Sequence, residues 1–430
     1  ATLNGKEFTS GSTVGFEGIY TLVVTDKAGN KTTVIFGIDK TAPIVSGVED
    51  GHVYNVNVIP TFNEGTAKLN GKEFTSGTVV SKEGSYTLVV TDKAGNKTTV
   101  KFEIDKTAPV VEGVEHGHYY NTNVIPTFNE GSATLNGKEF TSGTTVKTQK
   151  VYTLVVTDKA GNTTTVVFAI DKTAPVVSGV EDGNSYNTSV TPTFNEGTAT
   201  LNGTPFVSGT TLTQDGNYVL VVTDKAGNKT TVKFGIDSIA PVISGVNNGT
   251  YYNTNVTPTF NEGEATLNGE EFTNGTTITK DGDYTLIVTD KAGNKSVVKF
   301  VVDKTAPVVE GVENGTYYDV DVTPTFNEGN ATLNGNPFVS GTTLTQDGIY
   351  TLVVTDKAGN KTTVQFGIDR VAPVVSGVQN GKAYNTNVTP TFNEGSATLN
   401  GTKFVNGTTI TKEGEYTLVV TDAIGHTTTV

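Results

Sequence analysis

The chain has 430 residues, no cysteine and a formal net charge of −14 at pH 7, which excludes disulfides and thiolate metal sites. Acidic residues recur along its whole length, which argues against nucleic acid or an anionic membrane surface as a partner, since both attract basic patches. No apolar run approaches the roughly 20 residues that a membrane-spanning helix needs, so we expect no membrane insertion.

The sequence repeats with a period of 66 residues. The motif Thr-Asp-Lys-Ala-Gly-Asn starts at Thr25, returns at this spacing, and ends in a divergent copy that starts at Thr421. Such a period is typical of a tandem array whose small units gain stability from their neighbours. The predicted domains are a partial unit at 1–39 with the C-terminal strands only, units at 40–105, 106–171, 172–237, 238–303 and 304–369, and a slightly truncated unit at 370–430. We therefore expect a window of a longer array.

Residues 40–105 illustrate one unit. Hydrophobic alternation and turn residues predict, in chain order, strands at 44–48, 57–62, 67–69, 72–74, 78–80, 86–91 and 98–104. Pro60 indicates an edge or a bulge in the second strand, Gly47 indicates a bulge in the first, and Asn70-Gly71 is a strong hairpin signal. The predicted fold class is all-β: a linear array of small seven-stranded antiparallel Ig-like β-sandwiches joined by very short linkers.

A glycine and a tyrosine two residues apart, as in Gly84-Ser85-Tyr86, begin the sixth predicted strand of most units. This spacing fits a tyrosine corner, in which the hydroxyl bonds to nearby backbone, and it equally fits a core tyrosine beside a turn glycine.

Two motifs together carry a family resemblance. Val-Thr-Asp-Lys-Ala-Gly-Asn followed by Ile-Asp-Lys-Thr-Ala-Pro-Val-Val, at fixed spacing over the whole chain, resembles the tandem bacterial immunoglobulin-like (Big) repeats of cell-surface proteins and adhesins. The resemblance implies an extracellular location, on the bacterial cell surface or in a secreted fibre, and a role as a stalk.

The predicted units are separated by very little chain. Only Lys106, Thr107 and Ala108 lie between the predicted strand end at Asp105 and the next strand near Pro109. A three-residue linker that ends in proline leaves little freedom. We therefore expect the units to run end to end as a semi-rigid rod.

Repeated acidic residues are the candidate site. The predicted topology gathers a linker aspartate, a turn glutamate and the aspartate of Asp-Lys-Ala-Gly-Asn at one end of each unit, where carboxylate, carbonyl and amide oxygens suit Ca²⁺. The resemblance points the same way, since some large bacterial adhesins stiffen such junctions with Ca²⁺. The alternative is that these residues bond their own turns and pair with lysines, without a metal. The candidate interdomain metal ligands are Asp39, Glu64, Asp92, Asp105, Glu130, Asp158, Asp171, Glu196, Asp224, Asp237, Glu262, Asp290, Asp303, Glu328 and Asp356.

Near-identical units without a unique pocket favour a structural function. We expect a stalk or fibre segment that displays a terminal domain, with neighbouring repeats of the same chain as partners and with lateral or end-to-end self-association as a further expectation. The alternative is a multivalent adhesion module that binds glycan or protein through weak repeated sites, with Tyr54, Tyr120, Tyr186 and Tyr252 as its aromatic candidates. No catalytic set occurs, so we expect no enzyme, no cofactor other than the Ca²⁺ considered above, and a ligand that the sequence leaves unknown.

Overall fold

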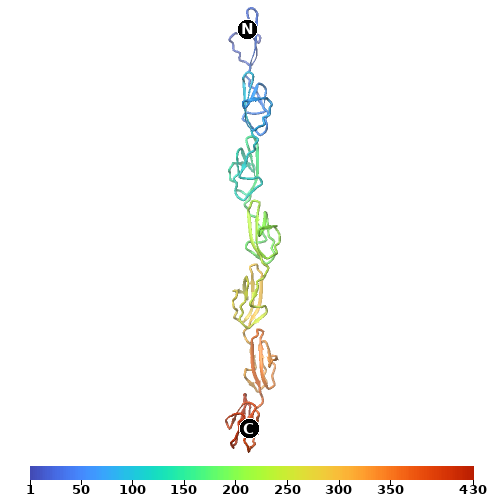
Figure 1. Cartoon of the computed structure of the whole chain (residues 1–430), viewed down its shortest axis with the longest axis vertical. Helices are drawn as coiled ribbons and strands as arrows, with labels where there is room; N and C mark the ends of the chain where they lie inside the picture. The colour runs from blue at the N-terminus through green and yellow to red at the C-terminus, as the bar shows by residue number, and fades with distance from the viewer. The chain divides into compact units, whose positions relative to one another are not determined.

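A computed structural model describes residues 1–430 and contains strands without any helix (Figure 1), as the all-β prediction requires. The chain forms two compact units, one of residues 1–182, 191–212 and 218–233, the other of residues 183–190, 213–217 and 234–430. The predicted 66-residue domain limits remain a prediction, although the same strands recur at that spacing.

Residues 40–105, in the first unit, form a five-stranded sheet and a two-stranded sheet. The larger sheet has the order β6-β11-β10-β8-β9 and the smaller one pairs β5 with β7. Their bounds are β5 (Val45–Ser46), β6 (Val53–Tyr54), β7 (Thr61–Phe62), β8 (Thr66–Leu69), β9 (Lys72–Phe74), β10 (Gly84–Thr91) and β11 (Lys97–Ile104). All ladders are antiparallel except β6 with β11, which is parallel.

The same elements recur in the rest of the first unit. The partial repeat has the sheet order β2-β1-β3-β4. The bounds are β1 (Thr2–Leu3), β2 (Lys6–Glu7), β3 (Gly18–Thr25), β4 (Lys31–Ile38), β12 (Val111–Glu112), β13 (Tyr119–Tyr120), β14 (Thr127–Phe128), β15 (Ser132–Leu135), β16 (Lys138–Phe140), β17 (Lys150–Thr157), β18 (Thr163–Ile170), β19 (Val177–Ser178), β21 (Thr193–Phe194), β22 (Thr198–Leu201) and β23 (Thr204–Phe206).

Strands β20, β24 and β25 complete the set at residues 172–237. Their bounds are β20 (Ser185–Tyr186), β24 (Gly216–Thr223) and β25 (Lys229–Ile236), and residues of β24 and β25 belong to both units.

The second unit repeats the five-plus-two arrangement twice and then a shorter version with the order β43-β42-β44-β45. Its bounds are β26 (Ile243–Ser244), β27 (Thr250–Tyr252), β28 (Thr259–Phe260), β29 (Glu264–Leu267), β30 (Glu270–Phe272), β31 (Gly282–Thr289), β32 (Lys295–Val302), β33 (Val309–Glu310), β34 (Tyr317–Tyr318), β35 (Thr325–Phe326), β36 (Asn330–Leu333), β37 (Asn336–Phe338), β38 (Gly348–Thr355), β39 (Lys361–Ile368), β40 (Val375–Ser376), β41 (Thr391–Phe392), β42 (Ser396–Leu399), β43 (Thr402–Phe404), β44 (Leu418–Thr421) and β45 (Thr427–Thr429).

Three of the predicted strands are much shorter than expected, and the one predicted at 44–48 is regular only in β5. The predicted strand at 78–80 contributes one bridge, between Val80 and Val58, and the strand at 57–62 is regular only in β7. The residue before β7, Pro60, has no N–H for a ladder, and its carbonyl accepts a hydrogen bond from the Gly77 N–H at 3.0 Å. Val53–Tyr54, interpreted as loop from the sequence, is the short strand β6.

The hairpin of β8 and β9 turns at Asn70-Gly71, where both residues have positive φ, 48° and 78°. Asparagine and glycine tolerate this left-handed backbone better than other residues. The Asn70 side chain also fixes the hairpin to β10, because its Oδ1 accepts from the Thr87 N–H at 2.7 Å and its Nδ2 donates to the Ser85 carbonyl at 3.0 Å.

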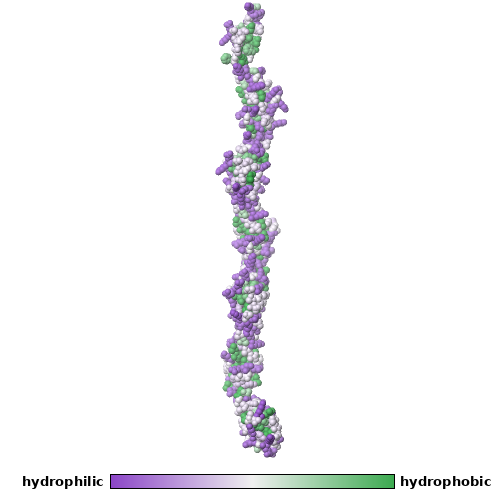
Figure 2. Space-filling view, turned by 90° about the vertical axis from the view of Figure 1, so that its left-hand side faces the viewer, coloured by the Kyte–Doolittle hydropathy of each residue, from purple (hydrophilic) through white to green (hydrophobic).

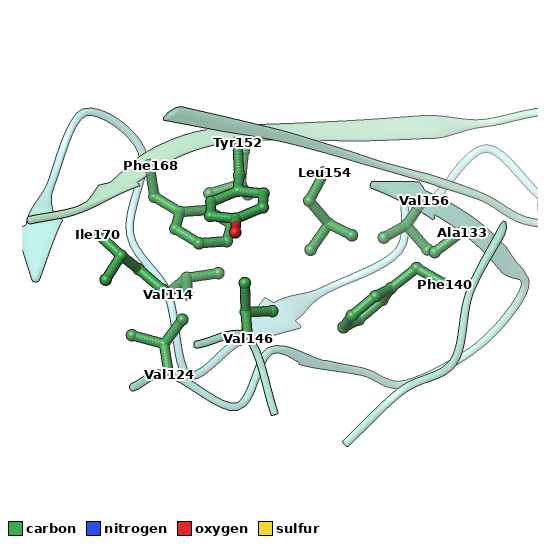
Figure 3. Close-up of a cluster of buried hydrophobic side chains, with 11 residues drawn as sticks. Val114, Val124, Ala133, Phe140, Val146, Tyr152, Leu154, Val156, Phe168 and Ile170 are labelled. Atoms are coloured by element: carbon green, nitrogen blue, oxygen red, sulfur yellow. The ribbon is translucent and has the colours of Figure 1, made fainter. Parts of the chain in front are cut away.

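The core lies between the two sheets (Figure 3). In residues 106–171, alternating side chains of β17, among them Tyr152, Leu154 and Val156, lie beside those of β18 on one face of the sheet and pack with the bridged pair Val124 and Val146. Leu154 and Val156 are fully buried. A period-two alternation therefore supplies one apolar face, as expected for a strand with one face toward the core.

The tyrosine corner is present. The Tyr152 hydroxyl donates to the Thr148 carbonyl, four residues earlier, at 2.8 Å, and its ring stacks on Phe168 with centroids 5.3 Å apart. The same bond joins Tyr20, Tyr86, Tyr284, Tyr350 and Tyr416 to the carbonyl four residues upstream. Of the two sequence interpretations, the corner is the one observed.

Candidate functional site

The Asp-Lys-Ala-Gly-Asn segment is the turn between the two long strands of each sheet. After β10, the Asp92 N–H donates to the Asn96 carbonyl at 3.1 Å. The Asn96 N–H and Nδ2 donate in return to the two carboxylate oxygens of Asp92, each at 2.8 Å. Gly95, with φ 98°, lets the chain reverse between them. The Asp92 side chain thus closes its own turn.

Burial raises the pKa of Asp92, but the hydrogen bonds from Asn96, Gly95 and Ala94 outweigh it and hold that pKa below its ordinary value. The same causes, in the same order, lower the pKa of Asp290 in the second unit. Hydrogen bonds within the turn therefore stabilise the anionic form of Asp92 and Asp290.

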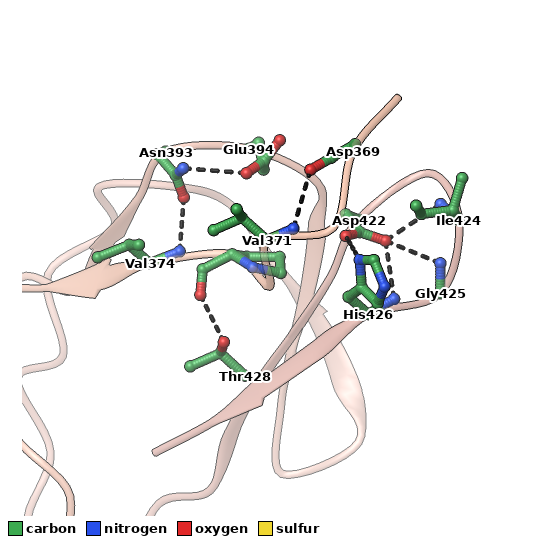
Figure 4. A network of polar contacts seen from close by, with 11 residues as sticks. Asp369, Val371, Val374, Asn393, Glu394, Asp422, Ile424, Gly425, His426 and Thr428 are labelled. Carbon is green, nitrogen blue, oxygen red and sulfur yellow. Dashed lines mark hydrogen bonds and ion pairs between the residues drawn. The ribbon is translucent and has the colours of Figure 1, made fainter. Parts of the chain in front are cut away.

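The same asparagine also reaches the preceding linker. Asn162 Nδ2 donates to the Asp105 carbonyl at 2.9 Å as well as to Asp158. The equivalent bonds join Asn96 to Asp39, Asn228 to Asp171, Asn294 to Asp237 and Asn360 to Asp303. In the last copy, His426 replaces the asparagine and directs its Nδ1 to Asp422 Oδ2 at 2.9 Å (Figure 4).

The start of the linker is bonded to the sheet that precedes it. The Asp105 N–H donates to the Tyr54 carbonyl at 2.9 Å, and Asp105 Oδ1 accepts from the Thr107 N–H at 3.1 Å. Lys106 donates its N–H to Glu83 at 2.8 Å and its ammonium to Asn57 Oδ1 at 2.7 Å and to the Ser81 carbonyl.

The end of the linker is bonded to the sheet that follows. The Pro109 carbonyl accepts from the Thr164 hydroxyl, and the Val110 N–H donates to Asn129 Oδ1 at 2.7 Å. Asp105 thus donates its N–H upstream and offers its carbonyl downstream. We call the linker residues 105–109, with the bonds on either side, the joint, and use the same word for the equivalent segments.

The side chains of the predicted metal ligands do not converge into one cluster at these joints. The structure contains no group of three or more histidine, aspartate or glutamate side chains that could hold a metal ion. Asp92 uses both carboxylate oxygens in its turn, the Asp39 carboxylate accepts from the Thr41 N–H at 3.0 Å, and Glu64 is exposed. The turn bonds of the metal-free alternative are present, and calcium at the joints remains a prediction without supporting geometry.

Lysines contribute less than that alternative expected. Lys106 bonds to carbonyl and amide oxygens and to Glu83, not to the three predicted carboxylates around it. Two ion pairs lie near the linkers, Lys304 with Asp281 at 3.6 Å and Arg370 with Asp321 at 2.6 Å. Neither aspartate is one of the predicted metal ligands.

At the last joint the three acidic positions do share one cleft. Asp369, Glu394 and Asp422 line a cavity of about 440 Å³ together with Tyr317 and Ala423. Figure 4 shows Asp369 bonded to the Val371 N–H, Glu394 bonded to Asn393, and Asp422 enclosed by its own turn. Asp369 and Glu394 are half-buried residues, while the carboxylate of Asp422 already accepts hydrogen bonds from its own turn.

The aromatic candidates of the adhesion alternative pack inward. The Tyr54 hydroxyl accepts from the Glu49 N–H at 2.8 Å, and its ring meets Phe102 edge-on with centroids 6.3 Å apart. Tyr120 and Tyr252 lie against their cores in the same way. The sequence reasoning missed their neighbours, Tyr119 and Tyr251, which point outward. The Tyr-Tyr doublet could have revealed them. Adjacent residues of a strand face opposite sides of the sheet, so one tyrosine of each pair points outward when the other points into the core.

The surface carries no extended apolar face in the view of Figure 2, where hydrophilic side chains are interspersed with small hydrophobic patches. An exposed aliphatic side chain recurs at one equivalent position of the joints. The residues at this position are Ile44, Val110, Val176, Val242, Val308 and Val374. The chain contains no helix that is long and apolar enough to cross a membrane.

Residues 36–106 and 232–304 match the family model of the bacterial Ig-like domain. Two of the repeats thus match the bacterial Ig-like domain. This confirms the resemblance drawn from the two motifs, since the two matched stretches each run from the end of one long strand, through the linker, to the end of the equivalent strand one repeat later.

A relative of these Ig-like repeats is an outer cell wall protein of Brevibacillus brevis (strain 47), 45% identical over 89 residues. The alignment covers 18% of this chain and 9% of that protein, so the chain corresponds to a small part of its relative's length.

Solved structures similar to the chain include the N-terminal eight Ig domains of Down syndrome cell adhesion molecule, at 12% identity, with 83% of this chain and 64% of that chain covered and a TM-score of 0.25. Another is a tetra-tandem repeat in the extending region of a large adhesion protein, at 16% identity, with 77% and 100% covered and a TM-score of 0.18.

Proposed function

We propose that the chain is a structural stalk segment of an extracellular bacterial surface protein, a semi-rigid rod of Ig-like repeats that displays a terminal domain. The observation that carries the proposal is the joint. The Asp105 N–H is bonded to the preceding sheet, its carbonyl is bonded to the following turn, and Pro109 restricts the rest of the linker. A linker bonded on both sides resists bending more than a solvated coil does.

Three further observations support a structural protein rather than an enzyme. Residues 36–106 and 232–304 match the bacterial Ig-like domain, one relative is named an outer cell wall protein, and the acidic side chains of the turns bond their own backbone. The cell surface is the location that these likenesses favour. Lateral or end-to-end self-association of such rods is part of the same proposal, and sedimentation of the chain over a range of concentrations tests it.

The adhesion alternative receives less support. Its aromatic candidates contact their own core, and the outward tyrosines Tyr119 and Tyr251 each lie beneath a lysine of the same chain. A glycan array probed with the full chain separates the two proposals: a blank array favours the stalk, and specific binding that disappears when Tyr119 and Tyr251 are changed to alanine favours adhesion.

The stiffness of a joint can be measured directly, because the chain has no cysteine and spin labels can be placed at will. Labels at Lys68→Cys and Lys138→Cys flank the joint at 105–109, on exposed strand positions. We expect a narrow distance distribution by electron–electron double resonance, broadened by Asn162→Ala and unchanged by Lys101→Ala. A wild-type distribution as broad as that of a variant with a glycine-serine linker at 106–108 would overturn the stalk proposal.

A further inference from the structure

Three strands present a tyrosine to solvent beside a joint. In β13, β27 and β34 the first residue of a Tyr-Tyr pair points outward and the second points into the core. The outward members, Tyr119, Tyr251 and Tyr317, are 37%, 39% and 40% exposed. The face of a tyrosine ring carries partial negative charge and attracts cations.

At two of these joints the chain supplies the cation itself. The Lys225 ammonium lies 5.7 Å from the centre of the Tyr119 ring, and that of Lys357 lies 5.6 Å from the centre of the Tyr251 ring. Each lysine follows the aspartate of the Asp-Lys-Ala-Gly-Asn turn in the following repeat, 106 residues after its tyrosine in the sequence. The turn thus places an alkylammonium over the ring.

At the third joint the lysine is missing. The residue 106 positions after Tyr317 is Ala423, and both line the cleft of about 440 Å³ at the last joint. Asp369 and Glu394 line the same cleft. Arg370, in the linker of this joint, does not line the cleft and pairs with Asp321 at 2.6 Å and with Asp347 at 3.7 Å. The site keeps its aromatic face and its negative charge but has lost its cation.

We propose that this cleft binds a primary alkylammonium group from outside the chain, in the place that the Lys225 and Lys357 ammonium groups hold at the sister joints. The ligand would be a lysine side chain of a protein or a free alkylamine, because the ring takes an ammonium on its face and the two carboxylates neutralise its charge. The overall charge of −14 also favours the approach of a cationic ligand.

The cleft suits an ammonium better than a hard divalent cation. Ca²⁺ requires six to eight oxygen ligands, and no group of three carboxylates in the structure could hold a metal. One Asp422 oxygen accepts the N–H groups of Ile424, Gly425 and His426, and the other faces the His426 ring, so this carboxylate has little capacity left for a metal.

The test is a titration of the full chain with cadaverine, followed by calorimetry and by saturation-transfer NMR of the ligand. We expect one site per chain. Ala423→Lys restores the sister arrangement and should abolish binding, and Tyr317→Ala should weaken it about tenfold. Lys357→Ala should open an equivalent cleft over Tyr251 and raise the stoichiometry to two. Thermal melts by circular dichroism confirm that each variant is folded.

The proposal would be overturned by no binding of cadaverine to the wild-type chain, or by binding that Ala423→Lys leaves unchanged. A parallel titration with CaCl₂ should show no effect of Ala423→Lys; competition between Ca²⁺ and cadaverine for the same site would assign the cleft to cations in general and also overturn it.

The source of the ammonium is decided by sedimentation. Self-association of the wild-type chain that Ala423→Lys suppresses identifies a lysine on a second copy. A monomeric chain that still binds cadaverine identifies a free amine or another protein's lysine, and both results agree with the proposed chemistry.

Discussion

The side chain of Asn162 donates a hydrogen bond to the main-chain carbonyl of Asp105, 57 residues earlier, at 2.9 Å. The same amide group donates to Asp158 within its own turn. One residue type therefore closes a turn and fastens it to the linker, which explains why Asn ends the repeated motif and why its loss should be felt at the joint.

Replacing Asn162 by alanine should loosen the joint at 105–109. The change removes the bonds to Asp105 and Asp158 and should cost about 1–2 kcal/mol locally. Hydrogen exchange of peptides that span 158–165 should become about tenfold faster. Lys159→Ala, an exposed residue of the same turn, is the control, and equal acceleration in both variants would contradict the role assigned to Asn162.

Replacing Gly131 by alanine should destabilise residues 106–171 severely. Gly131 has φ 82°, and an added Cβ would lie 2.3 Å from the Thr157 carbonyl oxygen, so the cost should be about 3 kcal/mol or more. Gly137 has φ 77° but open space around it, and Gly137→Ala should cost only the backbone strain of about 1 kcal/mol. Urea denaturation and limited proteolysis measure both, and similar losses would refute the close approach.

The tyrosine corner should contribute measurably through its hydroxyl. Tyr152→Phe removes the bond to the Thr148 carbonyl but keeps the stack on Phe168, so we expect a loss of about 0.5–1.5 kcal/mol in urea denaturation. Tyr152→Leu removes the stack as well and should cost more. If the phenylalanine variant is as stable as the wild type, the hydroxyl bond contributes nothing.

Stability should fall in acid. The pKa values of Asp92 and Asp290 are lowered in the folded chain, so these carboxylates stabilise the fold above the ordinary aspartate pKa, and this contribution is lost as pH falls through the lowered folded value. We expect Tm to be steady from about pH 7 to 5 and to decline below about pH 4. Asp290→Asn should flatten part of this decline, and a Tm that rises on acidification would show the sign to be wrong.

Chelation should leave the melting transition unchanged. The Asp92 carboxylate is fully used by Asn96, and three acidic side chains do not converge as metal ligands. Differential scanning calorimetry compares the Tm of the chain in EDTA with its Tm in CaCl₂. A Tm raised by Ca²⁺ and lowered by EDTA would restore the calcium interpretation, and aspartate variants such as Asp105→Asn would then locate the ion.

Features that depend on residues close together in the sequence were the part of the fold that could be predicted. Asn70-Gly71 forms the expected hairpin, because few residue pairs accept two successive left-handed conformations. Tyr86 bonds four residues back as a tyrosine corner requires. Strand β6 was missed, because two residues that pair in parallel with a distant strand leave no alternation to detect.

The site was harder to predict for a related reason. Placing Asp39, Glu64 and Asp92 at one end of the sandwich did not determine where their carboxylates point, and the acceptor capacity of Asp92 is used by Asn96 within the turn. The outward Tyr251 and its lysine lie 106 residues apart, so only the three-dimensional arrangement relates them.

The parallel pairing of β6 with β11 has a mechanical consequence. Val53 and Tyr54 lie beside Glu103 and Ile104, and the latter strand runs straight into the next linker. When the two ends of a repeat are pulled apart, parallel neighbours are drawn along each other's length, so their hydrogen bonds are strained together instead of opening one after another. Tension between β6 and the following linker is therefore met by shear at the edge of the sheet.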